Sequence, residues 1–273
     1  MPGPDAEAAK PSPERATGVA GRRPTVLVLG GTAEANDLVR ALGKRFPDHR
    51  LILSLAGRTR APSLPEGAEI RIGGFGGAAG LAAFLRAEAV GLLVDATHPF
   101  AAGMARNGAK AADVAGIRRL KLLRPAWQAV DGDRWTEVTC LAEARDALPK
   151  GARPFLALGR QHLSPFFSRG DLAPLARMIE PPDPPLPVGW TLVLSRPSPD
   201  WRAEAELMRA HGASHLVTRN SGGEASYAKV AAARELGLPV VMIARPAVPE
   251  GPVFETVEAL LAAVGRRSDL ATE

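Results

Sequence analysis

Arginines close several of the apolar runs in the second half of the chain. Four of these runs end at Arg160, Arg196, Arg219 and Arg245. If the runs are parallel strands, their carboxyl ends lie along one edge of a sheet, which is where open α/β folds bind ligands. Guanidinium groups pair with carboxylates and phosphates through parallel N–H donors. This edge is therefore predicted to bind a ligand with several acidic groups, although any one of these arginines could equally be a solvated surface residue.

A polar turn directly after Arg219 strengthens this prediction. Asn220, Ser221 and Gly222 open a helical pattern, where backbone N–H groups and a hydroxyl are available to an anion. A plain helix cap would have the same sequence. Arg124, which follows the last strand expected in the first half, is predicted to join the same site, whereas Lys229 is expected to be a solvated charge.

Two glycine-rich turns in the first half have the composition of phosphate-binding loops. The first lies between an apolar run and a helical pattern, where free N–H groups and the helix dipole favour an anion. The second follows another strand at the same expected edge. Neither has the G-x-G-x-x-G spacing, and each could be a simple tight turn. The residues concerned are Gly30, Gly31 and Thr32 in the first turn and Gly74, Phe75 and Gly76 in the second.

The end of the second expected strand bears on the choice of nucleotide. In dinucleotide folds an acid at this point accepts a hydrogen bond from the ribose 2′-hydroxyl, whereas an arginine pairs with a 2′-phosphate. The sequence here is Gly57-Arg58-Thr59. Arg58, with the Thr59 hydroxyl beside it, therefore favours NADP over NAD, unless Arg58 is only an exposed loop residue.

One histidine lies where it could serve chemistry. The segment Asp95-Ala96-Thr97-His98-Pro99-Phe100 closes the fourth expected strand, near the place a nicotinamide would occupy. Imidazole exchanges a proton near neutral pH, so His98 is the candidate catalytic residue, with a structural role beside Pro99 as the alternative. The other histidines have no metal-ligand spacing, and no metal site is predicted.

Composition limits the class of protein. The 273 residues are 46% hydrophobic and carry a formal net charge of +5, which is typical of a globular protein. Cys140 is the single cysteine, so no internal disulfide can form. No run approaches the roughly 18 apolar residues of a membrane span, and we expect a cytoplasmic protein with no membrane or nucleic-acid partner.

The elements that must position these residues alternate between strand and helix. Continuous Val, Ile and Leu runs favour parallel strands covered on both faces. The expected strands are 25–30, 51–57, 69–74, 91–98 and 118–124, then 153–159, 173–180, 191–196, 215–220 and 238–245.

Pro, Gly and polar residues over 125–134 interrupt the alternation of strands and helices and separate the first five expected strands from the last five. The predicted fold class is α/β, with two Rossmann-like domains whose mostly parallel sheets face a shared cleft. The predicted parts are a disordered tail (1–22), an NADP-binding domain (23–126), a substrate-binding domain (127–265) and a C-terminal tail (266–273).

Taken in order, the motifs between Thr25 and Pro246 resemble those of the precorrin-6A reductase family of cobalamin biosynthesis. They are LGGTAEA, SLAGRT, GGFGG, DATHPFA, RPAW, LGRQ, RNSGG and VVMIARP. The resemblance implies two Rossmann-like domains and NADPH-dependent reduction of precorrin-6A to precorrin-6B. The implied substrate is a polycarboxylate tetrapyrrole derivative, and other enzymes of that pathway are expected partners.

Carried over residue by residue, the resemblance implies cofactor contacts at the two glycine-rich turns and Arg58, with Thr97 and His98 near the nicotinamide. It implies substrate contacts at Arg196, Arg219, Asn220, Ser221, Gly222 and Arg245. There are two departures: Pro197-Ser198-Pro199 replaces the family's usual Arg-Gly-Pro-aromatic segment, and Arg219 stands where relatives often have lysine.

Two other functions are compatible with parts of the pattern, and a third is disfavoured by it. A protein that senses NADP or binds anions without catalysis would share the first-half motifs, and a two-domain glycosyltransferase would share the architecture. A nucleic-acid binder would need a basic stripe rather than arginines at separate strand ends. The sequence leaves open the oligomeric state, cobalt in the substrate, the proton donor, the face of hydride transfer and strand exchange between domains.

Overall fold

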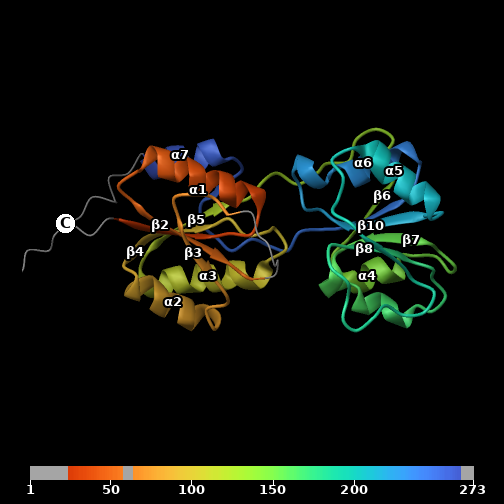
Figure 1. Cartoon of the computed structure of the whole chain (residues 1–273), viewed down its shortest axis with the longest axis horizontal. Coiled ribbons are helices and arrows are strands. Elements are labelled where there is room, and N and C mark those ends of the chain that lie inside the picture. Colours follow the sequence, from red (N-terminus) through yellow and green to blue (C-terminus); the bar gives the residue numbers. More distant parts are fainter. Residues whose placement is uncertain (1–23, 58–63, 266–273) are drawn as a thin grey trace, which may run out of the picture.

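Two parallel sheets, each with helices on both faces, make up the molecule (Figure 1). The structure is a computed structural model that describes residues 24–57 and 64–265. The predicted α/β class is confirmed: each sheet has six strands, and every strand pair is parallel. We call the two sheets with their helices the first and second lobes. The predicted tails, 1–22 and 266–273, lie outside the described residues.

The first lobe has the strand order β12-β5-β4-β1-β2-β3. Helices α1 and α7 cover one face, and α2 and α3 cover the other (Figure 1). The strands are β1 (Thr25–Leu29), β2 (Arg50–Leu55), β3 (Glu69–Ile72), β4 (Val90–Asp95), β5 (Arg118–Leu122) and β12 (Val253–Phe254), and the helices are α1 (Ala33–Arg45), α2 (Gly77–Ala87), α3 (Ala102–Ala115) and α7 (Val257–Gly265).

The second lobe has the order β6-β11-β10-β7-β8-β9. Helices α5 and α6 cover one face, and α4 with two 3₁₀ turns covers the other (Figure 1). The strands are β6 (Trp135–Val138), β7 (Pro154–Ala157), β8 (Leu175–Met178), β9 (Thr191–Leu194), β10 (His215–Arg219) and β11 (Val240–Ile243), and the helices are α4 (Leu141–Asp146), α5 (Trp201–Ala210) and α6 (Ala228–Glu235).

Burial explains why these runs form central strands. Every residue of β1 and of β11 is buried, as expected for parallel strands covered on both faces. The apolar residues of α1 at positions 35, 38, 39 and 42 are buried against the first sheet. This 3-4 spacing is the stripe that an amphipathic helix presents to a core.

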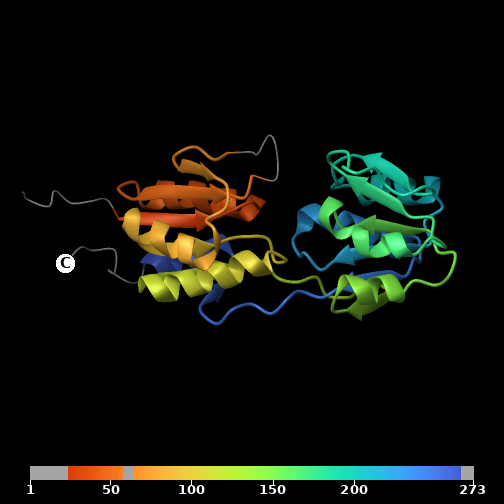
Figure 2. The ribbon, with the colours of Figure 1, turned by 90° about the horizontal axis from the view of Figure 1, so that it is seen from below.

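The C-terminal segment differs from the predicted domain range. Strand β12 pairs with β5 in the first sheet, and α7 packs against α1, so part of the range 127–265 belongs to the first lobe. The chain therefore crosses between the lobes twice, through segments 123–134 and 244–252 (Figure 2). Arg119 holds the returning segment by donating from Nη2 to the Glu250 carbonyl at 2.5 Å. A two-residue strand carries no recognisable periodicity, which is why the sequence left strand exchange open.

The segment after the first crossing also contains two elements that the sequence did not predict. Strand β6 lies at the edge of the second sheet, and its two central residues, Thr136 and Glu137, are polar and exposed, so its apolar signal is weak. Helix α4 has only six residues. Within the described ranges, no helix is both long and apolar enough to cross a bilayer.

Candidate functional site between the two sheets

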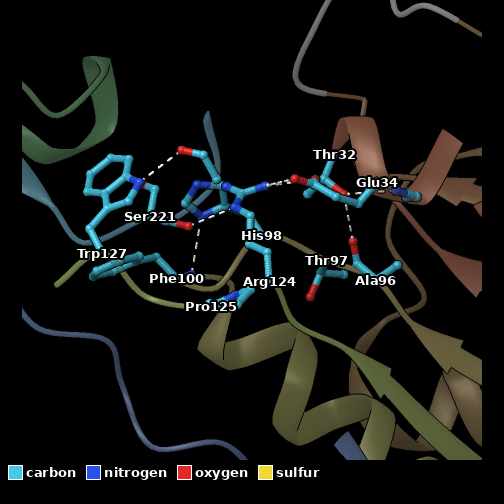
Figure 3. A network of polar contacts seen from close by, with 12 residues as sticks. Thr32, Glu34, Ala96, Thr97, His98, Phe100, Arg124, Pro125, Trp127 and Ser221 are labelled. Carbon is cyan, nitrogen blue, oxygen red and sulfur yellow. Dashed lines mark hydrogen bonds and ion pairs between the residues drawn. The ribbon is translucent and has the colours of Figure 1, made fainter. Parts of the chain in front are cut away.

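The carboxyl ends of both sheets contribute to one polar network (Figure 3). Glu34 lies in the first turn of α1, directly after β1, and Ser221 directly follows β10. The guanidinium of Arg124 contacts both, donating to the Glu34 carboxylate and to the Ser221 carbonyl. The Trp127 backbone N–H donates to Asn220 Oδ1 at 2.8 Å. The carboxyl edges of the two sheets thus face each other.

The turn between β1 and α1 combines one crowded and one open glycine. A Cβ at Gly30 would lie 2.5 Å from Leu53 Cδ1, so only glycine fits there, whereas one at Gly31, where φ is +108°, would meet no atom within 4 Å. Thr32 caps α1 by accepting from the Ala35 N–H at 3.1 Å, and its hydroxyl donates to the Ala96 carbonyl at 3.1 Å. The turn is therefore closely packed at Gly30 and open on the Cβ side of Gly31.

A buried ion pair fixes the neighbouring turn after β4. Lys121 Nζ lies 2.9 Å from Asp95 Oδ1, and the two side chains are 3% and 0% exposed. The same Asp95 oxygen accepts from the Thr97 backbone N–H at 3.0 Å and from the Thr97 hydroxyl at 2.6 Å. Lys121 also lies 3.4 Å from the Thr97 carbonyl. Removing two charges from water is costly, so the pair itself adds little to stability. Its role is to fix the conformation of the Asp95–Thr97 turn, because the same Asp95 oxygen also binds Thr97.

His98, the next residue, is held as a neutral imidazole. Its Nδ1 accepts from the Phe100 backbone N–H at 3.2 Å, so the ring proton is on Nε2. Burial, followed by the positive charges of Arg219, Arg124 and Arg245, lowers the pKa of His98 to about 3. At neutral pH His98 can donate a hydrogen bond from Nε2, but it does not carry an imidazolium proton to transfer.

Arg245 braces the first crossing segment against the second lobe. It donates from Nε to the Asn220 carbonyl at 2.8 Å, from Nη1 to the Arg124 carbonyl at 2.8 Å and from Nη2 to the Pro125 carbonyl at 3.0 Å. A Cβ at Gly222, where φ is +65°, would lie 2.1 Å from the Pro125 carbonyl oxygen and 2.2 Å from Arg245 Nη2. Glycine is required here for packing as well as for backbone conformation.

The glycine-rich loop after β3 is shaped by an arginine. Arg71 donates to the Gly73 carbonyl at 2.6 Å and to the Gly74 carbonyl at 2.8 Å, and its guanidinium lies 3.7 Å from the centre of the Phe75 ring. Gly76, with φ of +74°, is the N-cap residue of α2. The loop therefore lies at the same carboxyl edge as the Gly30–Thr32 turn.

A shallow pocket lies where the two turns of the first lobe meet the crossing segment. Its lining comes from α1, from the turn after β4 and from the chain after β5, and consists of Thr32, Glu34, Ala96, Thr97, Pro99, Leu122, Leu123 and Arg124. Figure 3 shows Thr32, Ala96 and Thr97 on the first-lobe side, with His98 and Arg124 between them and Trp127. Among residues 24–57 and 64–265, no three His, Cys, Asp or Glu side chains are grouped as metal ligands.

The family model for "Precorrin-6x reductase CbiJ/CobK" matches residues 25–265. The chain belongs to this family. A precorrin-6A reductase from Rhodococcus erythropolis is 47% identical over 240 residues, covering 88% of this chain and 95% of the relative. The precorrin-6A reductase of Rhodobacter capsulatus is 43% identical, covering 86% and 94%. A solved structure of CobK precorrin-6A reductase aligns with a TM-score of 0.82 at 42% identity, covering 89% of this chain and 96% of that one.

The resemblance inferred from the ordered motifs is therefore confirmed, and so is the expectation of a reductase. Within this reductase, the structure brings together many of the predicted site residues. Those at the facing edges are Gly30, Gly31, Thr32, Thr97, His98, Arg124, Arg219, Asn220, Ser221, Gly222 and Arg245. Arg58 and Thr59 lie outside the described residues.

The four strand-end arginines do not form one cluster. Arg219 Nη1 lies 3.0 Å from His162 Nε2, and its guanidinium lies 5.0 Å from the Phe100 ring centre, next to the network. Arg160 and Arg196 are exposed. Since β9 is three strands from β10, Arg196 lies about 14 Å from Arg219 along the edge at roughly 4.8 Å per strand. The arginines follow one edge, as expected, but spread along it.

Several residues of the network carried no recognisable signal in the sequence. Glu34, Lys121 and Trp127 were not predicted as site residues. For Glu34 alone the sequence offered a signal, since it lies two residues after the predicted phosphate-binding turn. Lys229 was expected to be solvated, and that expectation is wrong: it is 6% exposed, donates to the Ser226 carbonyl at 2.5 Å and lies 4.8 Å from the Trp127 ring centre. Burial, followed by the charge of Arg177, lowers the pKa of Lys229 to about 7.

Proposed function

We propose that this reductase converts precorrin-6A to precorrin-6B with NADPH, as a step of cobalamin biosynthesis. The observation that carries the proposal is the facing of two carboxyl sheet edges. One has a capped helix, an open glycine at Gly31 and a pocket, and the other ends in arginines. The names of the relatives support the choice of substrate.

The first-lobe edge fits a nicotinamide dinucleotide. The backbone of Gly30, Gly31 and Thr32 would hold the diphosphate at the positive end of α1, and the side of Gly31 on which a Cβ would lie is open. The loop containing Gly74, Phe75 and Gly76 would contact the nucleotide from the neighbouring strand. Arg58 and Thr59 are proposed to bind the 2′-phosphate. NADPH, when bound, supplies the hydride.

The turn after β4 is proposed to orient the reacting groups. Lys121 and Asp95 hold Thr97 in place, and His98 donates a hydrogen bond from Nε2. Since burial and the neighbouring arginines disfavour the imidazolium form of His98 in the ligand-free protein, water or the carboxylic acids of the substrate are proposed to supply the proton that accompanies the hydride. Positioning two ligands in this way can supply much of the rate enhancement of a hydride transfer.

The second-lobe edge is proposed to bind the acetate and propionate groups of the macrocycle. Arg160, Arg196 and Arg219 are spread along about 14 Å of sheet edge, a span suited to acidic groups around the rim of a large ring. Arg245, together with Asn220, holds the loop that presents Ser221 and Gly222. The predicted contacts at Ser221 and Gly222 would then be made by backbone groups of a braced loop.

The test combines product analysis with a cofactor-binding variant. Incubation with precorrin-6A and NADPH should give a product heavier by two hydrogen atoms, and an unchanged macrocycle would contradict the proposal. Arg58→Ala should raise the KM for NADPH at least about 10-fold, the value of a charged hydrogen bond, while leaving that for NADH nearly unchanged. Arg60→Ala, in the same segment, controls for a general loss of positive charge.

A further inference from the structure

Arg124 is bonded to both lobes at once. Its Nη1 donates to both oxygens of Glu34, at 2.9 and 2.7 Å, and its Nε donates to the Ser221 carbonyl at 2.8 Å. The Arg124 side chain is 16% exposed and that of Glu34 33% exposed. Figure 3 shows Arg124 between the two lobes, with Glu34 on one side and Ser221 on the other. A single side chain thus links the start of α1 to the loop after β10.

Glu34 is an unexpected residue at this position. It lies two residues after the Thr32 cap, in the wall of the pocket where the diphosphate is proposed to bind. Burial tends to raise the pKa of the Glu34 carboxyl, but its own backbone N–H, Arg124 and the Thr32 hydroxyl together lower it. The carboxylate is therefore charged, and its partners are those that a bound phosphate would seek.

The loop on the far side of Arg124 is packed directly on the ion pair. A Cβ at Gly223 would lie 2.8 Å from Arg124 Cδ and 3.5 Å from Glu34 Oε1. The Gly223 carbonyl accepts from Trp127 Nε1 at 2.8 Å. Any movement of Arg124 must therefore displace residues 221–223 or break their contacts with Arg124. These residues follow β10, the strand that carries Arg219.

We infer that Arg124 is a positioning residue that couples the proposed cofactor-binding edge of the first lobe to the proposed substrate-binding edge of the second. In the absence of cofactor, the Glu34 carboxylate occupies the position on Arg124 that a cofactor phosphate would take. When the diphosphate binds at the start of α1, it displaces the Glu34 carboxylate, and Arg124 exchanges Glu34 for the incoming anion. The bond from Arg124 to Ser221 is altered at the same moment, so the loop responds to the cofactor. The inference rests on the proposed function, since it takes a dinucleotide as the displacing ligand.

This coupling makes a prediction with a definite sign. Removing the Glu34 charge should strengthen anion binding, because the ligand no longer competes with a carboxylate for Nη1 of Arg124. A Glu34 that contacted the nucleotide directly, or that only braced the lobes, would give weaker or unchanged binding. Coupling energies between sites commonly correspond to a factor of about 5 or more in affinity.

The experiment compares Glu34→Gln with Asp37→Asn. Both remove one negative charge from α1, but Asp37 is exposed and pairs with Arg40 on the same helix, at 2.5 Å, outside the pocket lining. Calorimetric titrations with NADP⁺ and with inorganic pyrophosphate should show about 5-fold or tighter binding for Glu34→Gln and less than about 2-fold change for Asp37→Asn, which loses only a screened surface charge.

Hydrogen exchange supplies the readout of coupling. In the unaltered protein, NADP⁺ should change amide exchange over residues 220–227, and Glu34→Gln should show the same change without ligand, because in both cases Arg124 loses its Glu34 partner. Unchanged exchange in this loop, or unchanged or weaker NADP⁺ binding by Glu34→Gln, overturns the coupling while leaving the cofactor assignment intact. An unaltered protein that binds neither NADP⁺ nor pyrophosphate overturns the cofactor assignment and the coupling with it.

Discussion

Substituting Gly222 by alanine tests the packing that joins the crossing segment to the second lobe. The added Cβ would lie 2.1 Å from the Pro125 carbonyl oxygen and 2.2 Å from Arg245 Nη2. Neither neighbour is free to move, because Arg245 donates to three backbone carbonyls. The contact must be relieved by displacing backbone and breaking at least one charged hydrogen bond.

The expected cost can be divided into two parts. Alanine at φ of +65° costs about 1 kcal/mol, after allowing for the lower entropy of its unfolded chain. Overpacking and the loss of the Arg245 bond to Pro125 add about 3 kcal/mol. We therefore expect Gly222→Ala to lower the free energy of unfolding of the second lobe by about 4 kcal/mol.

Gly237 provides a matched control. Its φ is +63°, and a Cβ there would meet nothing within 4 Å, so Gly237→Ala should cost only about 1 kcal/mol. Urea denaturation followed by tryptophan fluorescence is the assay, because all four tryptophans, at 127, 135, 190 and 201, lie in the second lobe or the segment leading into it. Equal losses for the two variants would refute the claimed close approach.

Two further predictions concern the turn after β4. The pKa of His98 is near its ordinary value of 6.5 in the unfolded chain and about 3 in the folded protein, so unfolding takes up a proton between these values and the free energy of unfolding falls as the pH falls through this range. Between pH 8 and pH 5 the loss, measured by urea denaturation, should be about 2 kcal/mol. His98→Gln should abolish this part of the pH dependence. Lys121→Met leaves the Asp95 carboxylate buried and unpaired, and should cost about 3–5 kcal/mol; Lys121→Met combined with Asp95→Leu should recover most of that loss, and a double variant as unstable as the single one would contradict the ion-pair explanation.

Most of the fold was predictable because burial on both faces makes central parallel strands continuously apolar, as in β1 and β11. The elements that escaped prediction lack that signal. Strand β6 is a partly exposed edge strand, and β12 has only two residues. Their placement depends on which edge of which sheet is free, a tertiary property that no local pattern reports.

The site was predictable where strand ends and glycines marked it. Thr32 and Thr97 lie in the pocket wall, as their positions after strands suggested. The hydrogen bonds of Arg124 and Arg245 to groups of the protein itself were not predictable. The sequence does not distinguish an arginine that bonds to backbone carbonyls from one that is available to a ligand. The burial of Lys229 depends on Trp127, a residue 102 positions away in the chain that supplies the ring beneath it.

Label transfer tests the central claim, hydride transfer between ligands held by two facing sheet edges, most directly. The protein should be incubated with precorrin-6A and NADPH deuterated on one or the other face of the nicotinamide C4, and the macrocycle examined by mass spectrometry and NMR. A single deuterium should reach one ring carbon from only one of the two labelled cofactors. Deuterium that remains on the cofactor with both labels, or a ring hydrogen that comes only from solvent, would contradict it.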